Sequence, residues 1–98
     1  MSELPIEFET TPKGGRYFVR FSEDEDARRT YVRVSDTHWI ADHTFVPLPW
    51  RGGDIAERLV ERLITDARQA QARITPTCWY VADEFKRMSP AWDDVWMR

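Results

Sequence analysis

One stripe of apolar residues at helical spacing, in the second half of the chain, constrains the fold most. These residues recur at the spacing of one helix face: Ile55, Ala56, Leu59, Val60, Leu63, Ile64 and Ala67. The opposite face carries charged residues: Glu57, Arg58, Glu61, Arg62 and Arg68. The spacing predicts an amphipathic helix over residues 54–72. Because only one of its faces is apolar, the helix needs a sheet or another helix to cover that face.

The residues before this helix predict four strands. The first covers residues 4–10 and the last residues 38–46. Between them lie two segments of period two. In one, Tyr17, Val19 and Phe21 alternate with Arg16, Phe18 and Arg20; in the other, Thr30, Val32 and Val34 alternate with Arg29, Tyr31 and Arg33. Residues 11–15, 22–26 and 35–36 form short loops, so neighbouring strands should be antiparallel.

The residues after the long helix predict a short strand over residues 73–75 and a helix over residues 79–88, capped by Thr77. An aromatic tail over residues 91–97 should pack back on the core. A strand, a helix and a second strand make a crossover, so the last strand should run parallel to the strand before the helix. The predicted fold class is α+β: a mixed, mostly antiparallel sheet with a long crossover helix and a C-terminal helix.

Composition excludes several classes of protein. A chain of 98 residues forms one domain, residues 1–98, with one modest core. The net charge of −3 argues against nucleic-acid binding, and no apolar run reaches the roughly 20 residues that span a membrane. The single cysteine excludes an internal disulfide. His38 and His43, five apart in a strand, should point to opposite faces, and no metal site is expected. We expect a cytoplasmic monomer without a signal peptide.

The loop between the last strand of the first half and the long helix is the best candidate for a ligand site. It contains Arg51, Gly52, Gly53 and Asp54. Glycines at a helix start let free backbone amides approach an anion such as a phosphate, and Arg51 adds a permanent cation. The alternative is a tight turn in which the glycines serve only the backbone and Asp54 caps the helix.

Three segments around this loop resemble a known family. Arg51-Gly52-Gly53-Asp54-Ile55-Ala56 resembles the coenzyme A motif Arg/Gln-x-x-Gly-x-Gly/Ala of the GNAT N-acetyltransferase superfamily. The preceding His43-Thr44-Phe45-Val46-Pro47 and the later Pro76-Thr77-Cys78-Trp79-Tyr80-Val81 resemble the His-Thr-x-Val-Pro and Pro-x-Cys-x-Tyr-Val segments of a minimal, single-domain GNAT family. The resemblance covers roughly residues 16–96 and implies a reduced GNAT-like fold.

The resemblance implies acetyl-coenzyme A as cosubstrate, without a metal. The pyrophosphate would lie against the helix start, at Arg51, Gly52, Gly53, Asp54, Ile55 and Ala56. The backbone of Phe45 and Val46 would pair with the pantetheine arm, and Tyr80 would also contact the coenzyme. Asp54 stands where the family has glycine. Its carboxylate could fold back onto the amides that would hold pyrophosphate and weaken binding tenfold or more, or it could point to solvent.

Cys78 is the candidate catalytic residue. It precedes a predicted helix, and a helix N-terminus favours the thiolate, which can accept an acetyl group from a thioester. The matching cysteine of the resembled family is a proposed nucleophile. The alternatives are that Cys78 only fills space under the sheet, or that the amine attacks directly with the help of a general base.

The resemblance therefore implies an acetyl-coenzyme A-dependent N-acetyltransferase acting on a primary amine. The amine, on a small molecule or on a protein, cannot be read from the sequence. The alternative function is a non-catalytic acyl-coenzyme A-binding or interaction module, whose pyrophosphate loop is degraded by Asp54.

Overall fold

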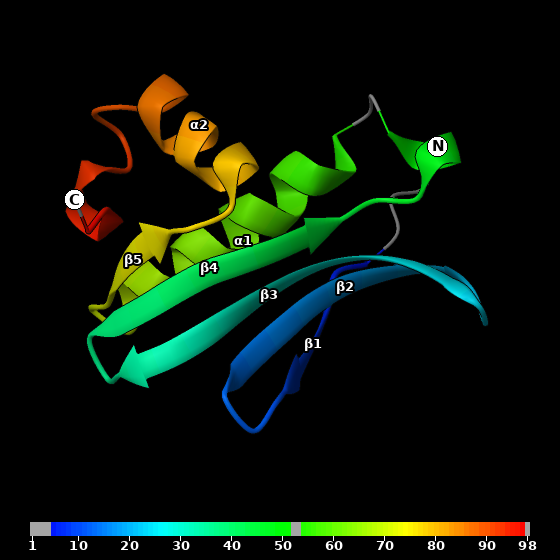
Figure 1. Ribbon diagram of the computed structural model, residues 1–98, viewed down its shortest axis with the longest axis horizontal. Coiled ribbons are helices and arrows are strands. Elements are labelled where there is room, and N and C mark those ends of the chain that lie inside the picture. Colours follow the sequence, from blue (N-terminus) through cyan, green and yellow to red (C-terminus); the bar gives the residue numbers. More distant parts are fainter. Residues whose placement is uncertain (1–4, 52–53, 98) are drawn as a thin grey trace.

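The computed structural model describes residues 5–51 and 54–97. The elements follow in the order β1 (Glu7–Thr10), β2 (Gly14–Ser22), β3 (Glu25–Ser35), β4 (His38–Phe45), the 3₁₀ helix η1 (Leu48–Trp50), α1 (Ile55–Gln69), β5 (Arg73–Pro76), α2 (Trp79–Arg87) and the 3₁₀ helix η2 (Asp93–Val95). Within the described residues, five strands form one sheet in the order β1-β2-β3-β4-β5 (Figure 1). The predicted α+β class and element order are confirmed.

The direction of the last strand is also confirmed. Strands β1 to β4 are antiparallel neighbours, whereas β5 runs parallel to β4, with His38 paired to Arg73 and Ala41 to Pro76. Helix α1 is the crossover between β4 and β5. It is shorter than predicted, because the chain turns through Gln71, whose positive φ of 58° leads directly into β5.

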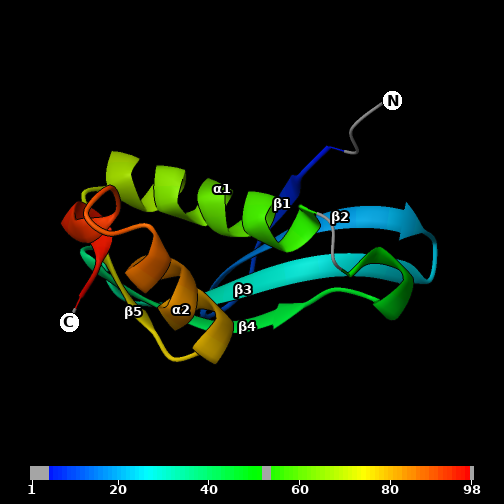
Figure 2. The same cartoon turned by 90° about the horizontal axis from the view of Figure 1, so that it is seen from above.

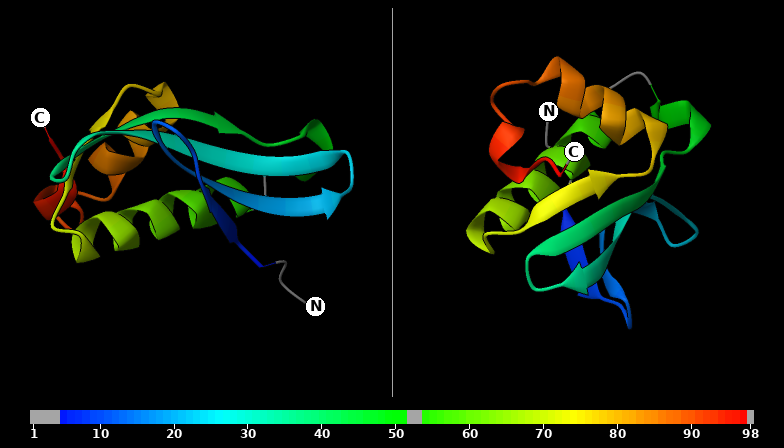
Figure 3. Two further views of the ribbon diagram at one scale, coloured as in Figure 1. Left: turned by 90° about the horizontal axis from the view of Figure 1, so that it is seen from below. Right: turned by 60° about the vertical axis from the view of Figure 1, so that its left-hand side comes forward.

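Both helices pack on one face of the sheet, which we call the inner face (Figures 2 and 3). The predicted apolar stripe of α1 supplies Leu59, Val60, Leu63, Ile64 and Ala67 to the core. Trp92 and Val95 of the C-terminal tail are buried in the same cluster, as predicted. No helix of the described residues is long and apolar enough to cross a membrane.

The alternation in β3 buries an unexpected set of residues. The inner face of β3 consists of Ala27, Arg29 and Tyr31, all buried. The aliphatic Val34 is 55% exposed instead. A strand usually buries the more apolar of its two alternating sets of residues, which in β3 is the set with Val32 and Val34. The structure buries the other set, which contains Arg29. A fully buried arginine therefore lies in the middle of the sheet.

A β-bulge in β4 changes the placement of the two histidines. Ala41 pairs with Tyr31 and His43 with Thr30, so Asp42 is an extra residue in β4. The extra residue resets the alternation, and the register puts His43 on the same outer face as His38. The prediction that they point to opposite faces is therefore wrong. Among the described residues, no group of three or more His, Cys, Asp or Glu side chains could hold a metal ion.

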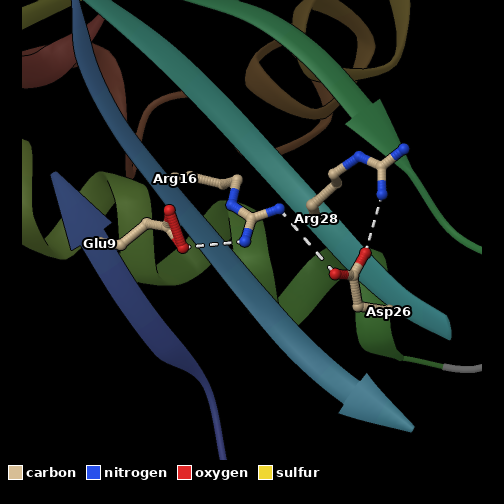
Figure 4. A network of polar contacts seen from close by, with 4 residues as sticks. All are labelled: Glu9, Arg16, Asp26 and Arg28. Carbon is tan, nitrogen blue, oxygen red and sulfur yellow. Dashed lines mark hydrogen bonds and ion pairs between the residues drawn. The ribbon is translucent and has the colours of Figure 1, made fainter. Parts of the chain in front are cut away.

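Charged side chains cover the outer face of the first three strands. Arg16 on β2 lies between Glu9 of β1, at 2.8 Å, and Asp26 of β3, at 3.9 Å (Figure 4). Arg28 pairs with the same Asp26 at 2.8 Å. The groups are partly exposed, so each pair contributes at most about 1 kcal/mol. Their main effect is to keep this face hydrated while the opposite face is buried.

One polar contact joins the sheet to α1 inside the core. The hydroxyl of the fully buried Tyr17 donates a hydrogen bond of 2.7 Å to Asp66 of α1. Burial, and then the hydrogen bond to this carboxylate, hold the pKa of Tyr17 well above its ordinary value. At the far end of α1, Arg68 donates to both carboxylate oxygens of Asp94, at 2.8 and 2.9 Å, which ties the C-terminal tail to the helix.

The Tyr17–Asp66 contact generates a test of the fold. Tyr17→Phe should lower the free energy of unfolding by about 2 kcal/mol, because it removes a buried hydrogen bond to a charged group and keeps the ring. Tyr31→Phe is the matched control, since that buried ring has no hydrogen bond from its hydroxyl to any described residue. Urea unfolding of the two variants measures the difference. Equal losses would show that the contact does not contribute to the stability of the fold.

Candidate active site

The candidate site forms where β4 and β5 separate. The two strands stay paired only as far as Ala41 and Pro76, after which β5 turns away toward α2 while β4 continues to Phe45 (Figure 1). The Ala41 carbonyl marks this point, because it accepts hydrogen bonds from the backbone amides of Thr77 and Cys78, at 3.1 and 3.3 Å. Thr77 Oγ1 donates to the same oxygen at 3.2 Å. Beyond Ala41, the β5-side edge of β4 is therefore not covered by β5.

A cavity of about 460 Å³ lies at this opening. It has three walls: the end of β4, Trp50 and Arg51 together with Ala56 of α1, and the start of α2. Its lining residues are Thr44, Phe45, Val46, Trp50, Arg51, Ala56, Cys78, Trp79 and Tyr80. The cavity thus combines lining residues from the stretch 44–56 with residues 78–80, which are more than 20 positions further along the chain.

Six of the residues predicted for the site line this cavity: Phe45, Val46, Arg51, Ala56, Cys78 and Tyr80. The two tryptophans nearest to them, Trp50 and Trp79, also line it, and Trp79 is 78% exposed. Asp54 and Ile55 lie at the start of α1 but outside the lining. Gly52 and Gly53 lie outside the described residues. The roles predicted for all of these residues remain predictions.

Trp50 and Arg51 are held against the sheet by side-chain contacts. The Trp50 ring stacks on Phe21 of β2 with a centroid distance of 4.1 Å and an angle of 4° between the rings. Its indole nitrogen donates to Glu25 at 3.4 Å. Arg51 Nε donates to the Val46 carbonyl at 2.7 Å. These contacts place the Arg51 cation at the end of β4, in the wall of the cavity.

Asp54 does not block the start of α1. It is the N-cap residue of that helix, it is exposed, and its side chain makes no capping hydrogen bond. Only its backbone carbonyl takes part in the helix, by accepting from the Arg58 amide at 2.9 Å. Of the two orientations predicted for the carboxylate, the one folded back onto the first amides is therefore not seen.

Cys78 lies in the cavity wall and is the N-cap residue of α2, so the prediction that Thr77 caps this helix is wrong. Partial burial works to raise the pKa of its thiol, but the opposing effects are larger and the pKa lies below its ordinary value. The opposing effects come from the Tyr80 and Val81 backbone amides at the helix start, from the Arg29 guanidinium and from the nearby Thr44 hydroxyl. This arrangement favours a thiolate, as the sequence analysis predicts for a cysteine at a helix N-terminus.

Two residues near the thiol were not predicted. Thr44 lines the cavity, and Arg29, its cross-strand neighbour on β3, is fully buried behind it. Thr44 is inside the resembled His-Thr-x-Val-Pro segment, so its position was available from the sequence. Arg29 has no such signal, because an arginine in an alternating strand is normally solvent-exposed.

The comparisons with known proteins agree with this geometry. The sequence model of the GCN5-related N-acetyl-transferase family matches residues 16–95. The fold is similar to the NMR solution structure of a GCN5-like protein from Staphylococcus aureus, with a TM-score of 0.73 and 22% sequence identity over 99% of this chain and 91% of that one. No curated protein matches the chain significantly.

The family match covers most of the chain and includes all three cavity walls. The structural likeness, at this low identity, supports the fold alone. The chain belongs to the GCN5-related N-acetyltransferase family.

Proposed function

We propose that the protein transfers an acetyl group from acetyl-coenzyme A to a primary amine, with Cys78 as the nucleophile. The observation that carries the proposal is the position of Cys78. Its thiol lines a cavity that opens at the free edge of β4 and is flanked by the start of α1. A donor thioester in this cavity would lie beside a cysteine that favours its thiolate form.

The residues around the cavity fit the chemistry of the donor. The edge of β4 beyond Ala41 offers backbone groups to the amides of an extended pantetheine arm. Arg51 provides a cation near the start of α1, where the helix dipole favours phosphate. The aromatic rings of Trp50, Trp79 and Tyr80 supply apolar contact area.

The proposed reaction has two steps. In the first, the Cys78 sulfur attacks the carbonyl carbon of the donor thioester, so that a new thioester forms on Cys78 and the coenzyme leaves as a thiolate. In the second, Cys78 is released as a thiolate when the amine nitrogen attacks the acetyl carbon and loses its proton to solvent. No oxidant, reductant or metal takes part.

The first prediction concerns the binding site. Coenzyme A should shift the backbone amide resonances of residues 45–46, 51 and 54–56 and leave those of β1 unchanged, because β1 is on the opposite side of the sheet from the β4 edge. Two-dimensional NMR spectra recorded during a titration with coenzyme A measure these shifts. Shifts confined to other residues, or none at millimolar coenzyme, would contradict coenzyme binding at this cavity.

The second prediction concerns Asp54. Its solvated carboxylate repels a phosphate by about 1 kcal/mol at 4 Å in water, so Asp54→Asn should tighten coenzyme A binding about fivefold. Asp54→Gly, which restores the family motif, should tighten it at least as much. Calorimetric titration measures both, with Asp36→Asn in the distant β3–β4 turn as the charge-matched control. If the control tightens binding equally, the effect is one of net charge alone.

The third prediction concerns Cys78. Incubation with acetyl-coenzyme A should add one acetyl group to the thiol, detectable by mass spectrometry as a label that hydroxylamine removes. Cys78→Ala should abolish the label and the transfer to amines but leave coenzyme A affinity nearly unchanged. Cys78→Ser should behave in the same way, because a hydroxyl is a much weaker nucleophile.

Two results would separate this proposal from its alternatives. Transfer that persists in Cys78→Ala would indicate direct attack by the amine, with Cys78 as a packing residue. Coenzyme binding without transfer to the thiol or to any amine would indicate the non-catalytic binding module.

A further inference from the structure

Arg29 is a charged residue buried without a carboxylate partner. It lies in the middle of β3 on the inner face of the sheet and has 0% of its surface exposed. None of its three guanidinium nitrogens makes a hydrogen bond of good geometry to any described residue. Arginine is almost never fully buried unless it is paired, because moving a charge out of water is costly. The position therefore calls for a negative group that the usual carboxylates do not supply.

The surroundings of Arg29 leave few candidates for that group. Its cross-strand neighbours are Tyr17 on β2 and Thr44 on β4. The Tyr17 hydroxyl is occupied by its hydrogen bond to Asp66. The carboxylate of Asp42 accepts a hydrogen bond from Thr30 on the exposed outer face, at 2.7 Å. Neither group makes a hydrogen bond to the buried guanidinium.

The thiol of Cys78 lies on the side of Thr44, the strand neighbour of Arg29, because Thr44 and Cys78 line the same cavity. The electrostatic interaction with Cys78 is the largest favourable influence on the Arg29 charge, ahead of those from Asp42 and Tyr80. On the other side of the sulfur, the Tyr80 and Val81 amides at the start of α2 also favour a negative charge. Cys78 thus lies between a buried cation and a helix N-terminus, and at the same time lines the cavity.

We propose that Arg29 is the counter-charge of a Cys78 thiolate and is the positioning residue that activates this nucleophile. The role of Arg29 in activating a nucleophile rests on the proposed function. The ion pair itself is a property of the unliganded protein. The Cys78 proton is released to solvent when the pair forms. With the thiol protonated, Arg29 would remain a buried cation, and the favourable negative charge left near it would be that of Asp42 on the outer face.

The two charges stabilise each other, and their pKa values should reflect this. Burial lowers the pKa of Arg29 to about 10, against the opposing effect of Cys78, so the guanidinium stays charged at neutral pH. The Cys78 pKa is lowered in turn by the guanidinium. The other titratable groups around the pair are Tyr80 on α2, Asp42 on β4 and Tyr17 on β2, whose pKa burial raises. Burial raises the pKa of Tyr80, so it is neutral in this range.

The test measures the thiol directly, without coenzyme. Cys78 is the only cysteine of the chain, so the rate of alkylation by iodoacetamide against pH reports its ionisation alone. In Arg29→Met, which keeps the length and removes the charge, we expect the thiol pKa to rise by roughly 1–2 units. The rate at pH 7 should fall at least tenfold. Arg29→Lys, which keeps a cation, should retain a rate within about threefold of the unchanged protein.

Circular dichroism shows whether Arg29→Met folds. If it does not fold, a second measurement on the unchanged protein still tests the ion pair. The thiolate absorbance of the unchanged protein is followed against pH, with Cys78→Ser as the blank. The midpoint of this titration should lie below the ordinary cysteine pKa of about 8.5. A thiol that titrates at or above that value would overturn the pair. So would a folded Arg29→Met variant with an unshifted alkylation profile.

A coenzyme A titration of the same variants separates this inference from the proposed function. If Arg29→Met changes the thiol pKa and coenzyme affinity stays the same, both stand, and acetylation of Cys78 should slow together with alkylation. If the thiol pKa depends on Arg29 but acetyl-coenzyme A never labels Cys78, the pair stands and acetyl transfer through Cys78 fails. If acetyl-coenzyme A labels Cys78 and the thiol pKa is the same in Arg29→Met, only the proposed ion pair is wrong.

Discussion

The arrangement of the site depends on one backbone acceptor, the carbonyl of Ala41. It accepts the amide of Thr77, which is the last hydrogen bond of the β4–β5 ladder, and also the amide of Cys78, which in a continuing strand would point away from β4. A regular parallel ladder would cover the edge of β4 as far as Phe45. The early departure of β5 instead leaves that edge open and places Cys78 at the opening. The cavity and the position of the thiol therefore have the same structural cause.

Most of the fold could be predicted because its strongest signals are local. The stripe from Ile55 to Ala67 indicates a helix by spacing alone, and a helix between two strands restricts β5 to a parallel position. The face of β3 could not be predicted in this way. Tyr31 and Val32 are both acceptable core residues, so the pattern does not distinguish the two faces, and Arg29 argues for the wrong one. The bulge at Asp42 leaves no mark in hydropathy either.

The candidate site was predictable to the extent that it is built from contiguous segments. Phe45, Val46, Arg51 and Cys78 lie in motifs whose order and spacing resemble the family, and all four line one cavity. Arg29 lies outside every such motif, 49 positions before Cys78 along the chain. Its relation to the thiol arises only when β3 pairs with β4 and α2 begins over that pair. Sequence spacing carries no information on such a contact.

The buried guanidinium also bears on the relation between stability and activity. An unpaired charge in a protein interior costs several kcal/mol, a large part of the 5–15 kcal/mol by which a domain is stable. The core here is small, so a residue with this cost would be replaced readily by an aliphatic one of similar size unless its charge were compensated. A thiolate at the start of α2 offers that compensation, and it requires no buried carboxylate beside Arg29. Cys78 must be ionised to react, and its negative charge would also offset the cost of burying Arg29. The chemistry of Cys78 and the stability of the fold around it are then linked.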